Sequence, residues 1–125
     1  MKAINFAADP PAAELFNEMA ESVAKKLNET QKREANKSTQ IRRFYDELVG
    51  WQQRIAGDED KFKRFEAFIR MLNAKVAYAK GRSLVDEAFA SWFSECIKAT
   101  TSAKALDHFR LHFEAVLGFL KALRG

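Results

Sequence analysis

Residues 39–48 read TQIRRFYDEL and residues 72–82 read LNAKVAYAKGR, and both stretches have the spacing of an amphipathic helix. In the first, apolar residues recur every three or four positions, from Ile41 through Phe44 to Leu48, which is the period of one face of an α-helix. In both, cations and aromatic rings lie directly beside the apolar face. A helix that only fills a core needs no cations along one edge, whereas a helix on a phosphate backbone does, because each neutralised phosphate releases condensed counterions. The two stretches therefore predict helices and suggest a polyanionic partner.

The same helical spacing extends over most of the 125 residues, and it predicts five helices in one domain spanning residues 1–125. The chain has only two prolines and five glycines, and no useful length of it alternates polar and apolar residues as a strand does. We therefore expect an all-α fold, a compact bundle of about five antiparallel helices. The expected helices span about residues 9–28, 38–56, 58–80, 83–99 and 103–125, with a flexible N-terminus over residues 1–8 and a basic linker over residues 30–37.

Particular residues mark the expected helix ends. Asp9 precedes two prolines, and proline suits the first helical turn because its missing N–H has no helical partner there. Ser38 or Thr39 is expected to cap the second helix, and Ser83 with Asp86 resembles the capping box that starts a fourth. One face of the third helix carries small residues, and we expect it to pack against the first or fifth helix, with contact to another copy of the chain as the alternative; these residues are Ala67, Ala74, Ala77 and Gly81.

Composition excludes several classes of protein. With 47% hydrophobic residues, and with 11 phenylalanines, the chain is too apolar to remain disordered. Its longest apolar run, residues 115–120, is far shorter than the roughly 20 residues of a membrane span. Cys96 is the single cysteine, so no disulfide can form within the chain, which fits a reducing compartment. We expect a cytoplasmic protein that makes no contact with a membrane.

Charge is distributed in blocks along the chain. Residues 24–43 carry a net charge of +5 and residues 61–82 a net charge of +6, whereas the remaining segments are acidic or neutral. The overall net charge of +4 therefore understates how basic these two segments are. Because blocks of one sign usually face a partner of the other sign, both segments are expected to meet an acidic molecule.

Few residues have the spacing of a catalytic or metal-binding site. Five scattered glycines do not make a phosphate-binding loop. His108 and His112 lie four residues apart, but Phe109 follows the first histidine where a zinc-protease helix needs glutamate. We expect two ordinary histidines near a helix surface, and we interpret Cys96 as a buried structural thiol because it lies on an apolar face. No catalytic residue, metal or cofactor is expected.

Three segments, in this order and spacing, resemble the small subunit of type III-A CRISPR–Cas effector complexes, the Csm-type small subunit. They are QIRRFYDEL at residues 40–48, AKVAYAKGR at residues 74–82 and HFRLHFEAVLGFLKAL at residues 108–123. The resemblance implies a prokaryotic, helical and non-catalytic protein of antiviral defence, several copies of which line up along a ribonucleoprotein filament. The implied partners are the guide RNA and target RNA duplex, the backbone and large subunits of the complex, and other copies of the chain.

The resemblance also implies a basic groove along the duplex backbone, while guide–target base pairing reads the sequence. The family motifs contain Arg42, Arg43, Lys75 and Arg82, which are expected to converge in one strip and contact phosphates. Tyr78 lies on the same helix face as Lys75 and Arg82, where its ring could stack on a base or on an arginine, and packing in the core or at an interface is the alternative for it. Position and charge alone add five RNA-binding candidates: Lys37, Lys61, Arg64, Arg70 and Lys80.

Three alternatives fit parts of the same sequence. The small subunit of type III-B complexes is also helical and basic. A helical-bundle enzyme could hold a metal at His108 and His112, although two histidines need further ligands. A protein adaptor could present the same basic face to an acidic protein partner.

Overall fold

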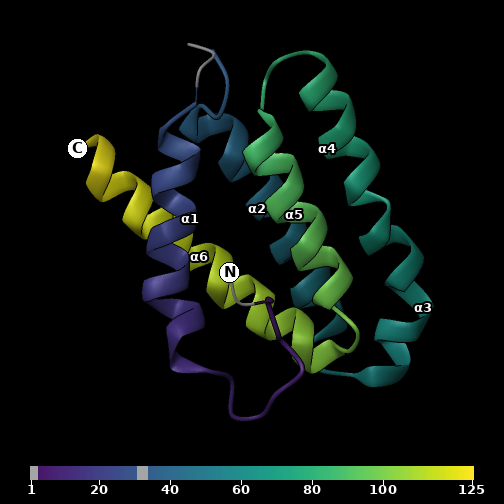
Figure 1. Ribbon diagram of the computed structural model, residues 1–125. Coiled ribbons are helices and arrows are strands. Elements are labelled where there is room, and N and C mark those ends of the chain that lie inside the picture. Colours follow the sequence, from purple (N-terminus) through teal and green to yellow (C-terminus); the bar gives the residue numbers. More distant parts are fainter. Residues whose placement is uncertain (1–2, 31–33) are drawn as a thin grey trace.

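The computed structural model describes residues 3–30 and 34–125, and within these residues all regular structure is helical (Figure 1). The expectation of an all-α bundle is therefore confirmed for this part of the chain. A short 3-10 turn precedes six α-helices: η1 spans Ala13–Phe16, α1 Glu18–Asn28, α2 Ser38–Ile55, α3 Glu59–Arg70, α4 Leu72–Gly81, α5 Glu87–Ala99 and α6 Ala103–Arg124.

The longest helix, α6, organises the bundle. Both α1 and α2 pack against it, and in Figure 1 it crosses the molecule diagonally behind α1. Helix α5 packs against α4 and α1, while α3 packs against α2. As a result α2 lies beside α3, and many residues of α3 and α4 are exposed.

The core between α2, α5 and α6 is built from aromatic rings. Phe89 and Phe93 of α5 and Phe109 and Phe113 of α6 are fully buried and contact one another. Trp92 meets Phe113 edge to face, with ring centroids 5.0 Å apart. Aromatic pairs prefer such offset or perpendicular arrangements because the ring edge is positive and the face negative. The core residues recur with the 3–4 spacing that predicted the helices.

The N-terminal segment departs from the expected helix over residues 9–28. The α-helix begins only at Glu18, because Asn17 has a non-helical backbone (φ −135°, ψ −95°) that separates the 3-10 turn from α1. Phe6 is fully buried and stacks on Phe109 with ring centroids 5.4 Å apart. This packing was not part of the expectation of a flexible terminus over residues 1–8.

The expected third helix, residues 58–80, is divided in two. Helix α3 ends at Arg70 and α4 begins at Leu72, with Met71 between them in a right-handed helical conformation (φ −65°, ψ −16°). Neither glycine nor proline stands at this junction; instead the flattened ψ angle shifts the hydrogen bonding toward the tighter 3-10 pattern, and Ala74 N–H donates to the Met71 carbonyl at 2.9 Å. The two helices therefore follow one path along the side of the bundle (Figure 1).

Three expected details at the helix surface are wrong. Lys37 is the residue at the N-cap position of α2, without a side-chain bond, and Ser38 is already helical. Helix α5 is capped by Asp86, whose carboxylate accepts from Phe89 N–H at 3.0 Å, whereas Ser83 adopts a left-handed conformation (φ 61°). The small residues Ala67, Ala74, Ala77 and Gly81 are exposed rather than packed against another helix of the chain, since the core is filled by larger residues on other faces of α3 and α4.

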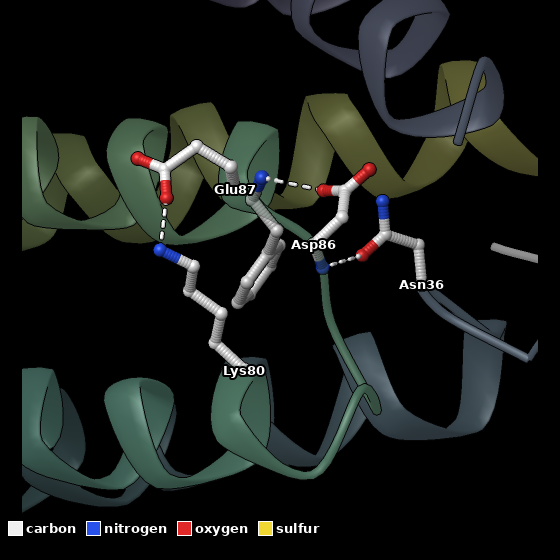
Figure 2. A network of polar contacts seen from close by, with 5 residues as sticks. Asn36, Lys80, Asp86 and Glu87 are labelled. Atoms are coloured by element: carbon white, nitrogen blue, oxygen red, sulfur yellow. Dashed lines mark hydrogen bonds and ion pairs between the residues drawn. The ribbon is translucent and has the colours of Figure 1, made fainter. Parts of the chain in front are cut away.

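Asn36 joins four parts of the chain close to the upper end of the bundle. Its side chain is buried, donates to the Leu27 carbonyl at 3.1 Å and accepts from Asp86 N–H at 3.0 Å (Figure 2). Its backbone N–H donates to the Leu84 carbonyl at 3.0 Å, and its own carbonyl accepts from Arg124 at 2.9 Å. The expected basic linker, residues 30–37, includes residues 31–33, which lie outside the described residues; the described end of that segment is anchored by Asn36.

None of the described helices is both long enough and apolar enough to cross a lipid bilayer.

Candidate nucleic-acid interface

An ion pair connects the two helices that carry the motif residues. The Lys75 ammonium of α4 lies 2.8 Å from a carboxylate oxygen of Glu47 on α2. Residues four apart share a helix face, so Arg43 of α2 lies on the same side as Glu47, toward α4. Arg43 is exposed and has no ion-pair partner among the described residues.

Tyr78 and Arg82 continue this surface toward the end of α4. They follow Lys75 at intervals of three and four residues, which places all three on one face of the helix. The Tyr78 side chain is 64% exposed, and Arg82 donates from Nη1 to the Tyr78 hydroxyl at 3.1 Å. The Arg82 guanidinium carbon lies 5.9 Å from the Tyr78 ring centroid. We name this surface the basic strip, and it consists of Arg43 on α2, Lys75 and Tyr78 on α4, and Arg82 at the C-cap of α4.

The structure does not bring Arg42 onto the basic strip. One residue along an α-helix turns the side chain by about 100°, and Arg42 points toward α6 instead of α4. There it lies over the Tyr45 ring at 5.7 Å and lines a groove of about 520 Å³ between α2 and α6 together with Lys121. The expectation that all four motif cations converge in one strip is therefore wrong for Arg42.

The groove beside Arg42 also contains acidic and hydrogen-bonding groups. The Tyr45 hydroxyl donates to Glu114 at 2.8 Å, and Glu114 lies 3.7 Å from Arg110. Burial, together with the bond to Glu114, raises the pKa of Tyr45 above its ordinary value, so this hydroxyl remains a donor at neutral pH. The lining of this groove therefore combines the cations Arg42 and Lys121 with the carboxylate of Glu114.

The five candidates chosen by position and charge fall into two groups. Three of them pair with carboxylates: Lys37 with Glu34 at 2.5 Å, Arg70 with Glu66 at 3.2 Å, and Lys80 with Glu87 of α5 (Figure 2). Since Lys80 reaches toward α5, it lies on the side of α4 away from α2. Lys61 and Arg64 are exposed on α3 and have no ion pair among the residues that the structure describes.

A cation in an exposed ion pair can still bind a phosphate group. Lys75 and Glu47 have side chains that are 50% and 34% exposed, and exposed pairs of this type contribute about 0–1 kcal/mol because water screens both charges. A phosphate group can therefore displace Glu47 from Lys75 at small cost.

An aromatic cluster lies at the other end of the same surface. Trp51 of α2 and Phe68 of α3 stack with ring centroids 5.7 Å apart and planes 8° apart. The Arg54 guanidinium carbon lies 4.6 Å from the Phe65 centroid and 5.6 Å from the Trp51 centroid. This cluster was not identified from the sequence; the three-residue spacing between Trp51 and Arg54 is the signal that could have brought them together on one helix face.

The two histidines are buried, so the expectation that they lie near a helix surface is wrong. His112 donates from Nδ1 to the Leu15 carbonyl at 2.5 Å, and its Nε2 accepts from the Trp92 indole N–H at 3.2 Å. Burial lowers the pKa of His112, partly offset by the bond to Leu15. His108 Nδ1 lies 2.7 Å from the Phe6 carbonyl. Both histidines fasten the N-terminal segment to α6.

The remaining candidates for chemistry are also occupied or enclosed. Both ring nitrogens of His112 are bonded within the protein, and no group of three or more potential metal ligands occurs among the described residues. Cys96 is fully buried, and burial raises the pKa of its thiol well above the ordinary value, as expected for a structural cysteine.

A second face of the molecule has the opposite character. A cavity of about 760 Å³ lies between α1 and α5, with Met19, Val23 and Trp92 among its apolar lining residues. Its polar lining includes three glutamates and one lysine: Glu18, Glu87, Glu95 and Lys26. Phosphates are repelled by such an acidic lining, so the structure favours the surface of α2, α3 and α4 over this one as a nucleic-acid interface.

Comparison with known proteins gives one family match over most of the chain. The family model described as Csm2 Type III-A matches residues 10–125, which includes all six α-helices. A search of curated proteins gives no match, and a search of solved structures gives none either.

Proposed function

The chain belongs to the Csm2 family of type III-A CRISPR small subunits, matched over residues 10–125, and we propose that it binds the RNA backbone through its basic strip without catalysing a reaction. The supporting observation is the strip itself. It combines Arg43 from α2 with Lys75, Tyr78 and Arg82 from α4 on one open surface. Cations on a surface of this length suit a linear polyanion, because each contact neutralises one phosphate.

The proposed RNA contacts carry no sequence information of their own. Phosphate contacts fix position and orientation, whereas base edges carry the sequence. In RNA-guided complexes base pairing between guide and target supplies the recognition, so a small subunit needs only cations that follow the backbone. The guide–target duplex, with the target strand facing this subunit, is the proposed ligand.

The proposed partners extend to protein. We propose that the chain joins the backbone and large subunits and further copies of itself in an antiviral ribonucleoprotein filament. One copy offers three cations on the strip, which corresponds to a salt slope of about −2 on a log–log plot for single-stranded RNA. Copies that bind one RNA side by side gain affinity because later contacts become intramolecular.

We also propose that the chain has no catalytic role, because its reactive side chains lie in the core. His108, His112 and Cys96 are all buried in the core. The alternative of a type III-B subunit has no such support, since the family that matches is that of type III-A.

A double charge reversal tests the proposal in the assembled complex. Arg43→Glu with Arg82→Glu is expected to lower target-RNA retention at physiological salt at least tenfold, because two attractive contacts become repulsive. Lys25→Glu with Lys98→Glu makes the same change in net charge on α1 and α5, and it is expected to retain RNA normally. Equal retention by the two double variants, each correctly assembled, would refute the assigned strip. Loss of RNA only when an acidic protein competes would favour the adaptor function.

A further inference from the structure

Trp51, Phe65, Phe68 and Arg54 form an aromatic cluster that is partly exposed at the surface. Trp51 and Phe68 lie parallel, and Phe65 tilts against both with centroids 5.5 and 6.5 Å away. Phe68 remains 48% exposed, and Met71, the next residue along this face, is 52% exposed. Large apolar side chains that stay exposed together mark a binding surface more often than isolated ones do.

The cluster lies in line with the basic strip. Phe68, Met71, Lys75 and Tyr78 follow one another at intervals of three, four and three residues, which is the spacing of one helix face. Met71 keeps a right-handed helical backbone, so this line passes through the junction between α3 and α4. Phe68 and Tyr78 are ten residues apart, which is about 15 Å along a helix, and Lys75 lies between the two rings.

The charge beside the cluster favours RNA over a protein partner. Arg54 lies over two rings and has no carboxylate partner among the described residues, so its charge remains available to a ligand. The segment that carries Phe68, residues 61–82, has a net charge of +6. An apolar protein surface would leave these charges unpaired, whereas a nucleotide brings a flat ring and a phosphate together.

We propose that the Trp51–Phe68 pair is a stacking site for an unpaired nucleobase of the bound RNA, with Arg54 contacting the adjoining phosphate. This proposal rests on the proposed function, because it requires that RNA binds to this surface. Base–aromatic stacking tolerates any sequence because every base has a π-face, and it alternates with cations along single-stranded nucleic-acid sites. The aromatic rings then hold bases at two places, near Phe68 and near Tyr78, and the cations hold the backbone between them.

The test uses two oligomers that differ only in having bases. The full-length chain is titrated at low salt with a labelled twelve-nucleotide adenosine RNA and with an abasic ribose-phosphate oligomer of the same length and charge. Affinity is read by fluorescence anisotropy, and stacking is read by quenching of tryptophan emission. Trp51→Phe assigns the quenching, because the other tryptophan, Trp92, is buried in the core.

The proposal predicts that the RNA quenches Trp51 and binds about tenfold more tightly than the abasic oligomer. Phe68→Ala and Phe68→Leu should remove this tenfold difference and leave abasic binding unchanged. Leu111→Ala, which alters an exposed apolar residue of α6, should change neither measurement.

Three other outcomes would overturn the stacking site, and they are distinguishable. Equal binding of both oligomers without quenching of Trp51 would overturn the stacking site while leaving the proposed backbone function intact. Binding of neither oligomer would overturn the proposed function and the stacking site together. If Phe68→Ala leaves RNA binding unchanged but prevents incorporation into the complex, the cluster is a protein interface and the stacking site is refuted.

Discussion

The Lys75 ammonium lies 2.8 Å from a Glu47 carboxylate oxygen, which places an acidic residue in the middle of the basic strip. This ion pair connects α4 to α2 and at the same time masks one of the three cations of the strip. An RNA phosphate that binds Lys75 must displace Glu47 or share the ammonium with it. Under the proposed function, the pair therefore affects the strength of RNA binding more than the stability of the fold.

Removing the charge of Glu47 should strengthen RNA binding. Glu47→Gln leaves Lys75 free for a phosphate and removes a repulsive carboxylate, so we expect about threefold to tenfold tighter RNA binding. Its cost in unfolding free energy should stay below about 1 kcal/mol. Glu87→Gln is the matched control, because it frees Lys80 on the α5 side of α4. Equal gains in the two variants would show that binding responds to net charge alone.

Neighbouring arginines should behave differently. Arg43 lies on the strip, whereas Arg42 faces the groove between α2 and α6, so Arg43→Ala should weaken RNA binding several-fold and Arg42→Ala much less. The two variants have the same net charge and the same helix propensity. Their dissociation constants for RNA, measured side by side at one salt concentration, give the comparison. A larger effect at Arg42 would move the interface to the groove beside Lys121.

Stability should fall on acidification because of His112. Burial lowers its folded-state pKa below 6.5, its ordinary value, so the unfolded chain binds a proton more readily than the folded one. Below about pH 6.5 the unfolding free energy then decreases, by at most about 1.4 kcal/mol per pH unit from this group. Urea unfolding at pH 7.5, 6.5 and 5.5, with His112 titrated by NMR, measures both quantities. A His112 pKa above 6.5 in the folded chain would reverse the expected sign.

Asn36 should be among the most sensitive polar residues. Asn36→Ala removes the bonds to the Leu27 carbonyl and to Asp86 N–H and places alanine in a left-handed conformation (φ 59°), so we expect a loss of about 2–4 kcal/mol. Asn36→Gly loses the same bonds but adopts that backbone without strain, and its loss should be smaller. Chemical unfolding of the wild type, Asn36→Ala and Asn36→Gly separates the loss of the hydrogen bonds from the backbone strain. Equal stability of wild type and Asn36→Ala would show that the junction is unimportant.

The helices follow from sequence because their apolar residues repeat with the helical period. Ile41, Phe44 and Leu48 are all buried on one face of α2, as their spacing predicts. The break at Met71 is not predictable in this way, since it depends on a single flattened ψ angle without a glycine or proline. The start of α1 at Glu18 is not predictable either, because it depends on the non-helical backbone of Asn17.

The interface is predictable in composition but not in geometry. The sequence identifies Arg42 and Arg43 as equally good candidates, and only the packing of α2 against α6 and α3 directs them to different neighbours. The buried histidines are a second example, because their carbonyl partners, Phe6 and Leu15, lie about a hundred residues away in the chain. Polar residues on a buried face need such distant partners, and helical periodicity cannot supply them.

Photocrosslinking in the assembled complex tests the RNA interface most directly. A target RNA substituted with 4-thiouridine is bound by the complex, irradiated, and the crosslinked peptides of this subunit are identified by mass spectrometry. We predict crosslinks within residues 39–55 and 65–82, the segments that carry the basic strip and the aromatic cluster. Crosslinks confined to α1 and α5, around the acidic cavity, would contradict the account.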